Sequence, residues 1–115
     1  MSAKENDHII IADRVNFEQV REYCAGAGPR SLEKFERNAP LADFVVMKLD
    51  AAERTCRLAW GKGVGGLLSG VEQLYSERAQ IRLLLVKGSE AEAAVRNSLT
   101  QLGATMIRSG DETIN

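Results

Sequence analysis

The chain has 115 residues, 44% of them hydrophobic and 27% charged, which is the composition of a single globular domain with its own core. Fifteen Lys and Arg against sixteen Asp and Glu give a net charge of −1, which disfavours nucleic-acid binding as the main role. Two cysteines and one histidine are too few for a disulfide framework or a histidine-rich metal centre. No apolar run approaches the ~20 residues of a membrane span, and the start lacks a signal-peptide core, so we expect a cytoplasmic protein.

The first half of the chain predicts a strand, two helices and a hairpin. Phe17, Val20 and Cys24 recur at helical spacing, and a capping-box pattern at Asn16 and Gln19 precedes them. β-branched and apolar runs predict strands on either side of the helical region. The expected elements are a strand at 8–12, a helix from 17 to the glycines at 26–28, a helix at 31–38, and strands at 44–49 and 55–60 joined by a turn at 50–53.

The second half alternates helices and strands. The run at 81–86 is apolar enough for a central strand covered on both faces, and Ser89 with Glu92 forms a second capping box. Gly103 supplies the expected stop of the last helix. The expected elements are a helix at 64–77, a strand at 81–86, a helix at 90–102 and a strand at 104–108.

These elements predict an α/β fold in the order βααββαβαβ, with parallel βαβ connections in the second half. We expect one domain over residues 8–108, a flexible N-terminus at 1–7 and a polar tail at 109–115. The sequence contains no internal repeat and no linker that would divide it.

The strand-to-helix junction after residue 60 is unusually rich in glycine. It carries Gly61, Gly63, Gly65 and Gly66, and Gly70 follows one turn later. Glycines cost backbone entropy at a helix entrance, and no Ser, Thr, Asp or Asn stands there to cap it. The junction therefore suits a phosphate or pyrophosphate, with Lys62 as an added positive charge.

Other roles for these glycines remain open. They could serve only a tight turn and close packing of the helix on the sheet. Gly61, Gly63 and Gly66 also fit the dinucleotide pattern G-x-G-x-x-G, but Lys87 follows the next strand where an acidic residue is expected. A Walker loop is excluded because the junction lacks the Gly-Lys-Ser/Thr ending.

The junction, LAWGKGVGGLL at 58–68, resembles the acyl-CoA loop of the GNAT superfamily of N-acetyltransferases. The resemblance extends over residues 53–108, since the following helix, strong strand, Ala-rich helix and last strand match the family order. Leu102 and Gly103 stand where the family has a Leu-Gly pair. A mixed sheet flanked by helices is the fold that this resemblance implies.

The resemblance implies binding of acetyl-CoA or another acyl-CoA, and acetyl transfer to an amine of a small molecule or protein. The strand would pair with the pantetheine arm and the loop amides would hold the pyrophosphate. The implied cofactor-binding residues are Leu58, Ala59, Trp60, Gly61, Lys62, Gly63, Val64, Gly65 and Gly66. Arg54, Arg57, Lys62, Arg82 and Lys87 lie on strands that border the loop, where they would contact phosphates or form local salt bridges.

Two departures keep a second function open. Trp60 replaces the Arg or Gln that usually opens the loop, and Leu99 stands where the family often has its general-acid tyrosine. A non-catalytic regulatory or protein-interaction module is therefore the alternative to an enzyme. The chain is also short for the family, so an open sheet edge would suit a homodimer. Of the cysteines, Cys24 is expected in the core and Cys56 at a half-buried strand position.

Overall fold

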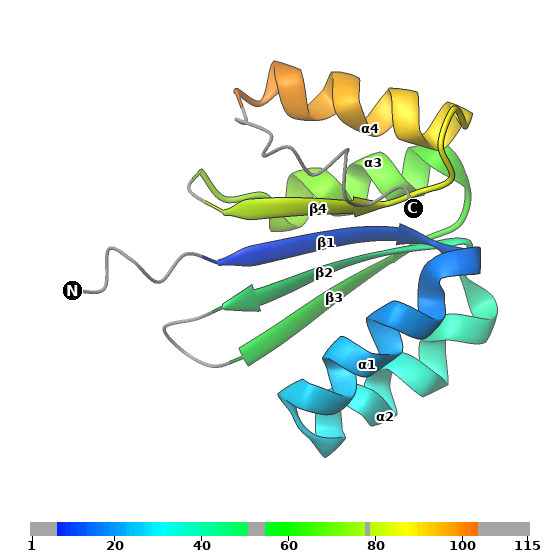
Figure 1. Cartoon of the computed structure of the whole chain (residues 1–115), viewed down its shortest axis with the longest axis vertical. Coiled ribbons are helices and arrows are strands. Elements are labelled where there is room, and N and C mark those ends of the chain that lie inside the picture. The colour runs from blue at the N-terminus through cyan, green and yellow to red at the C-terminus, as the bar shows by residue number, and fades with distance from the viewer. Residues whose placement is uncertain (1–6, 51–54, 78, 104–115) are drawn as a thin grey trace.

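The computed structural model describes residues 7–50, 55–77 and 79–103. Within them, four strands and four α-helices form three layers, with helices on both faces of one sheet (Figure 1). The elements are β1 (His8–Asp13), α1 (Phe17–Ala27), α2 (Pro29–Asn38), β2 (Phe44–Asp50), β3 (Thr55–Gly61), α3 (Gly63–Leu74), β4 (Gln80–Leu84) and α4 (Glu90–Gln101), with short 3-10 turns η2 (Arg14–Asn16) and η3 (Ala39–Leu41).

The α/β class expected from the sequence is confirmed, and the strand order within the described residues is β3-β2-β1-β4. β2 runs antiparallel to both β1 and β3, whereas β4 runs parallel to β1. The strands before and after α3 therefore run in one direction but lie at opposite edges of the described sheet. β4, expected at the centre, pairs with β1 alone among the described strands, and β1 and β2 are the inner ones.

Each face of the sheet has its own apolar core. α3 and α4 cover one face, where Ile11, Leu83 and Leu67 are at most 1% exposed. α1 and α2 cover the other, around Val20, Met47 and Phe35. Alternate residues of β1 point into different cores, so the middle of this strand, Ile9–Ala12, is apolar without interruption.

The two predicted capping boxes have different outcomes. At α4 the Ser89 hydroxyl accepts from the Glu92 amide, as expected. At α1 the prediction is wrong, because Asn16 makes no side-chain cap. Its amide instead donates to Asp13 and to the carbonyl of Leu84, 68 residues away, and so ties β1 to β4.

The helix bounds follow from local chemistry. Gly28, with φ +123°, separates α1 from α2, and Pro29 opens α2 at a position where its missing N–H costs nothing. Gly103 has φ +82°, the left-handed conformation expected after α4. The predicted strand at 104–108, the N-terminus at 1–6, the tail at 109–115 and most of the turn at 50–53 lie outside the described residues. None of the described helices has the length and apolar character to cross a membrane.

Candidate functional site

The strands bring four chain segments together at one end of the sheet. The pairings of Asp13 with Phe44 and of Phe44 with Gly61 place the end of β1, the start of β2 and the end of β3 side by side. β1 leads into α1 on one face, and the parallel β4 leads into α4 on the other, so their carboxyl ends form a topological switch point (Figure 1). Open α/β sheets bind ligands in the crevice at such a point.

A surface pocket of about 530 Å³ lies at this switch point, within the range typical of small-molecule sites. We call it the switch-point pocket. It is lined by Asp13, Arg14, Val15, Asp43, Phe44, Val64, Val86, Ser89, Glu90 and Ala91. Most of the wall is apolar, and its rim exposes 73% of Val15 and 49% of Val86 to solvent.

Asp13 holds the floor of the switch-point pocket together. It is 9% exposed and lies at the last position of β1. One carboxylate oxygen accepts from the Val86 amide at 2.7 Å, and the other accepts from the Asn16 side chain at 2.8 Å. Because the buried carboxylate has a donor on each oxygen, it fixes the β1 and β4 loops relative to each other.

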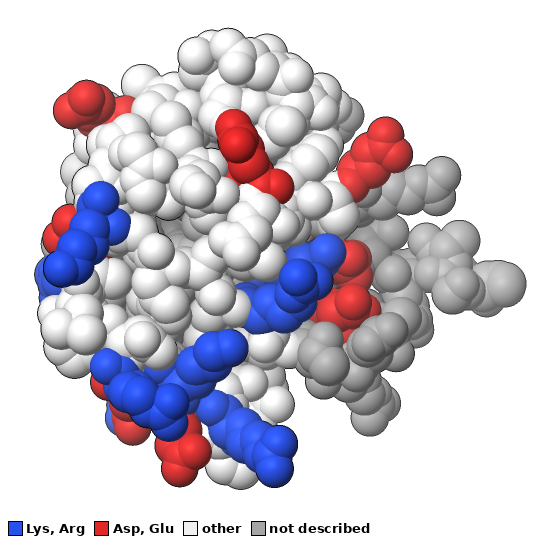
Figure 2. Space-filling view, turned by 180° about the vertical axis from the view of Figure 1, so that it is seen from behind, with Lys and Arg blue, Asp and Glu red and all other residues white. Residues whose placement is uncertain are grey.

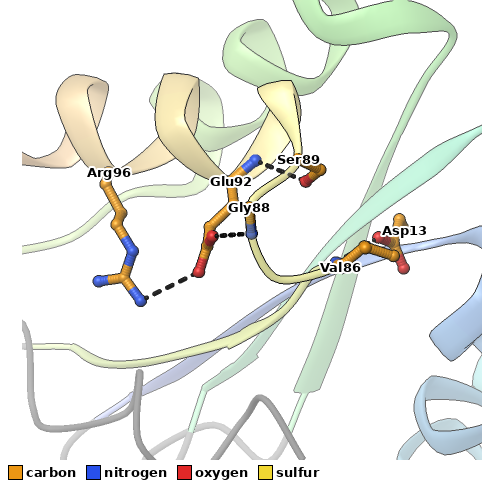
Figure 3. A network of polar contacts seen from close by, with 6 residues as sticks. All are labelled: Asp13, Val86, Gly88, Ser89, Glu92 and Arg96. Atoms are coloured by element: carbon orange, nitrogen blue, oxygen red, sulfur yellow. Dashed lines mark hydrogen bonds and ion pairs between the residues drawn. The ribbon is translucent and has the colours of Figure 1, made fainter.

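The loop from β4 to α4 is held by a second polar network (Figure 3). The Glu92 carboxylate accepts from the Gly88 amide at 2.8 Å and pairs with Arg96 at 3.3 Å, while the Glu92 amide donates to Ser89. Gly88 itself has φ +79°, which a residue with a side chain would adopt only under strain. The Ser89 hydroxyl thus meets one first-turn amide of α4, and the Glu92 carboxylate holds the loop residue that precedes the cap.

Three glycines of the β3–α3 junction are required by packing. A Cβ on Gly61 would lie 2.7 Å from backbone atoms of Gly66 and Leu67, and one on Gly66 would lie 3.1 Å from Gly61. A Cβ on Gly70 would approach Ala59 at 3.2 Å and Val46 at 3.3 Å. Close approach of α3 to β3 and β2 therefore explains Gly61, Gly66 and Gly70, as the packing alternative supposed.

The other two glycines differ from these. Gly63 has φ +81° and Gly65 is exposed, and a Cβ at either would meet no atom within 4 Å. A left-handed turn explains Gly63, whereas neither packing nor conformation explains Gly65. Lys62, which lies between the end of β3 and Gly63, is exposed as well.

No side chain at the start of α3 caps it, as expected, but the expectation that its first-turn amides are all free is wrong at Gly63. The Asp43 carboxylate, 20 residues earlier in the chain, accepts from the Gly63 amide at 3.0 Å. The Asp43 amide in turn donates to the carbonyl of Gly61 at 2.9 Å, and Arg14 lies 4.0 Å from the same carboxylate while donating to the carbonyl of Ala42. The protein thus supplies its own anion at the helix entrance.

The remaining predicted site residues are divided between the two sides of the sheet. Leu58 and Trp60 pack toward the α1–α2 core, where the Trp60 ring lies 5.4 Å from that of Phe35. Ala59 packs toward α3, and Val64 lines the switch-point pocket. The Trp60 indole N–H is buried and has no hydrogen-bond partner among the described residues.

The expected basic cluster around the loop does not form among the described residues. Arg57 and Lys62 belong to the β3 edge, whereas Arg82 lies on β4 at the opposite edge. Arg82 donates to the Tyr23 hydroxyl at 2.7 Å and so faces the α1 side. Arg54, expected in the same cluster, lies outside the described residues.

The sequence did not single out the switch-point pocket. Neither Asp13 nor Asp43 is among the site residues that the sequence predicts. One signal was present: both aspartates stand at strand ends, where loops of an α/β fold carry polar site residues. No family model, curated protein or solved structure matches this chain.

Proposed function

We propose that the chain is a non-catalytic binding module whose switch-point pocket takes an amine-bearing ligand with an apolar body. The observation that carries this proposal is that acidic side chains outnumber basic ones in a pocket whose surface is mostly apolar. Asp13, Asp43 and Glu90 line it against one cation, Arg14. A protonated amine on an apolar body would complement both properties of the wall.

The helix entrances at the pocket support the same ligand class. The N-termini of α3 and α4 would by themselves attract an anion. Asp43 already accepts from the Gly63 amide, and Glu92 from the Gly88 amide. Because the protein's own carboxylates occupy these positions, a phosphate or carboxylate ligand would meet repulsion there.

The chemistry of the pocket favours binding over catalysis. The chain's one histidine, His8, begins β1, whereas the pocket lies at the end of that strand. Cys24 and Cys56 belong to the α1–α2 core instead. Asp13 and Asp43 both accept hydrogen bonds from backbone amides that hold the pocket together. Among the described pocket residues there is also no histidine that would form an acid–base couple with a carboxylate.

A matched set of ligands tests this proposal. We expect 3-phenylpropylamine to perturb the NMR signals of the Val15, Val64 and Val86 methyl groups, and 3-phenylpropanol to perturb them less. The isosteric 3-phenylpropionate should leave them unchanged, because the pocket is acidic. Equal binding of amine and carboxylate, or shifts located elsewhere, would reject an amine site.

Glu90→Gln should weaken binding of the amine about fivefold, corresponding to ~1 kcal/mol. Glu90 is exposed in the first turn of α4, so its replacement removes charge without breaking a core contact. Titration followed by NMR measures the dissociation constant. Glu72→Gln, at an exposed position toward the other end of α3, is the matched control and should bind as the unmodified chain does.

Acyl-CoA binding, and with it N-acetyl transfer, is the second candidate function. Gly65 favours this function, because neither close packing nor a positive φ explains why a glycine stands at this exposed position. Lys62 is exposed beside it, and β3 is an edge strand of the described sheet, so its outer backbone groups would be available to a pantetheine arm.

Gly65→Ala separates the two candidates. A methyl group there meets no atom within 4 Å, so the variant should fold normally but hinder a pyrophosphate seated on the loop. If the chain binds acetyl-CoA, saturating ligand should raise the melting temperature of the unmodified protein by several degrees and that of Gly65→Ala by less. CoA, ATP and NADP serve as ligand controls, and a chain with no CoA-dependent shift would exclude this second function.

A further inference from the structure

The two cysteines, 32 residues apart in sequence, meet in the tertiary structure. Cys24 on α1 is fully buried, and Cys56 on β3 is partly exposed and packs against the same core. Their side chains are hydrogen-bonding partners. Because the two thiols interact within one core and α1 packs against β3, a disulfide between them would join this helix to this strand.

The surroundings activate one cysteine and keep the other protonated. The hydrogen bond from Cys24, with further help from Ser31 and the charge of Lys34, lowers the pKa of Cys56 to about 7, although burial opposes the shift. The same hydrogen bond, together with burial, raises the pKa of Cys24. The thiolate is the nucleophilic form, so Cys56 is the reactive member of the pair.

The charge around Cys56 agrees with this assignment. Figure 2 shows that the Lys and Arg side chains of this face gather in the lower half of the view, with some Asp and Glu among them. Ser31 and Lys34 both come from α2, which packs beside β3. A partly exposed cysteine beside a cationic side chain such as Lys34 is the kind that oxidants reach.

We propose that Cys56 is an oxidation site for small hydroperoxides and that Cys24 resolves the oxidised sulfur into an intramolecular disulfide. The Cys56 thiolate attacks one peroxide oxygen, the O–O bond breaks, and hydroxide leaves as Cys56 becomes a sulfenic acid. The Cys24 sulfur then attacks the Cys56 sulfur, the S–O bond breaks, and the Cys24 proton leaves with that oxygen as water. Two thiols and one hydrogen peroxide thus give one disulfide and two waters.

The cysteine pair is separate from the switch-point pocket, because it lies in the α1–α2 core and neither cysteine lines the pocket. The disulfide would fasten α1 to the edge strand of the described sheet. Peroxide reactivity is therefore expected whether or not an amine or an acyl-CoA binds.

The experiment treats the full chain with one equivalent of hydrogen peroxide and follows free thiols and intact mass. The expected product has lost two hydrogens, is monomeric on a non-reducing gel and regains both thiols with dithiothreitol. Surviving thiols, or a disulfide between chains, would overturn the proposal.

Variants assign the two roles. Cys24→Ala should stop at a Cys56 sulfenic acid that dimedone traps, because the resolving sulfur is gone. Cys56→Ser should leave the buried Cys24 unreacted; its oxidation at the unmodified rate would also refute the assignment. Circular dichroism and the melting temperature of each reduced variant show that it is folded, and the Cys24→Ala and Cys56→Ser results are compared only among folded proteins.

The pH dependence of alkylation distinguishes a reactive cysteine pair from two cysteines that only pack against each other. Alkylation of Cys56 by iodoacetamide should be about tenfold slower at pH 6 than at pH 8, because its pKa is about 7. In Cys24→Ala the midpoint should move to higher pH, since the hydrogen bond that lowers it is lost. An unchanged midpoint in that variant would contradict the pairing.

Discussion

Gly61→Ala is expected to destabilise the fold by at least about 3 kcal/mol. The new methyl carbon would lie 2.7 Å from the carbonyl carbon of Gly66 and from the amide nitrogen of Leu67. Both are backbone atoms of the first turns of α3, so relief requires moving the helix off the sheet. Urea unfolding followed by circular dichroism measures the change in the free energy of unfolding.

Gly65→Ala is the matched control for that result. It places the same methyl group four residues later, in the first turn of α3, where no atom lies within 4 Å. Since alanine is the better helix former, the variant should be stabilised by about 0.5–1 kcal/mol. Equal stability of Gly61→Ala and the unmodified chain would show that α3 does not approach β3 as described.

Asp13→Ala should produce the second large effect, a loss of about 3 kcal/mol and a fall of roughly 12 °C in melting temperature. The substitution removes the acceptor of the Val86 amide and of the Asn16 side chain, in a place where Asp13 is only 9% exposed. Donors left without an acceptor at such a site carry their full desolvation cost. Calorimetry measures the shift.

Asp13→Asn refines the Asp13 prediction. Its oxygen can still accept from the Val86 amide, but its NH₂ group then faces the NH₂ group of Asn16. We expect an intermediate loss of stability and altered NMR signals at Leu84 and Val86, whose positions depend on this network. A variant as stable as the unmodified chain would show that the carboxylate does not join the two strand ends.

The spacing of the glycines at 61–70 predicted the turn but not the different surroundings of each glycine. The pattern at 61–66 correctly marked a strand-to-helix turn. Spacing alone treats its glycines as one motif. In the structure, Gly61, Gly66 and Gly70 lie where α3 meets the sheet, whereas a Cβ on Gly63 or Gly65 would meet no atom within 4 Å. Which atoms a missing Cβ would have met depends on how α3 lies on the sheet, and the helix sequence does not contain that information.

Local pattern also determined most of the elements. The apolar period of 3.6 at Phe17, Val20 and Cys24 and the period and composition of the strands are properties of neighbouring residues, so the four described strands and four α-helices lie close to their expected ranges. The Ser89 cap and the left-handed Gly103 follow from the same short-range chemistry. These features need no knowledge of the rest of the chain.

Only the tertiary structure decided the sheet order and the site. Pairing of β1 with β4 joins segments about 70 residues apart, and no residue in either strand specifies its neighbour. That pairing creates the switch-point pocket, the β2–β3 pairing brings Asp43 to the Gly63 amide, and packing of α1 against β3 brings Cys24 to Cys56. The α/β class was therefore readable from local periodicity, whereas the proposed binding site and the proposed redox pair depend on long-range contacts that local periodicity does not encode.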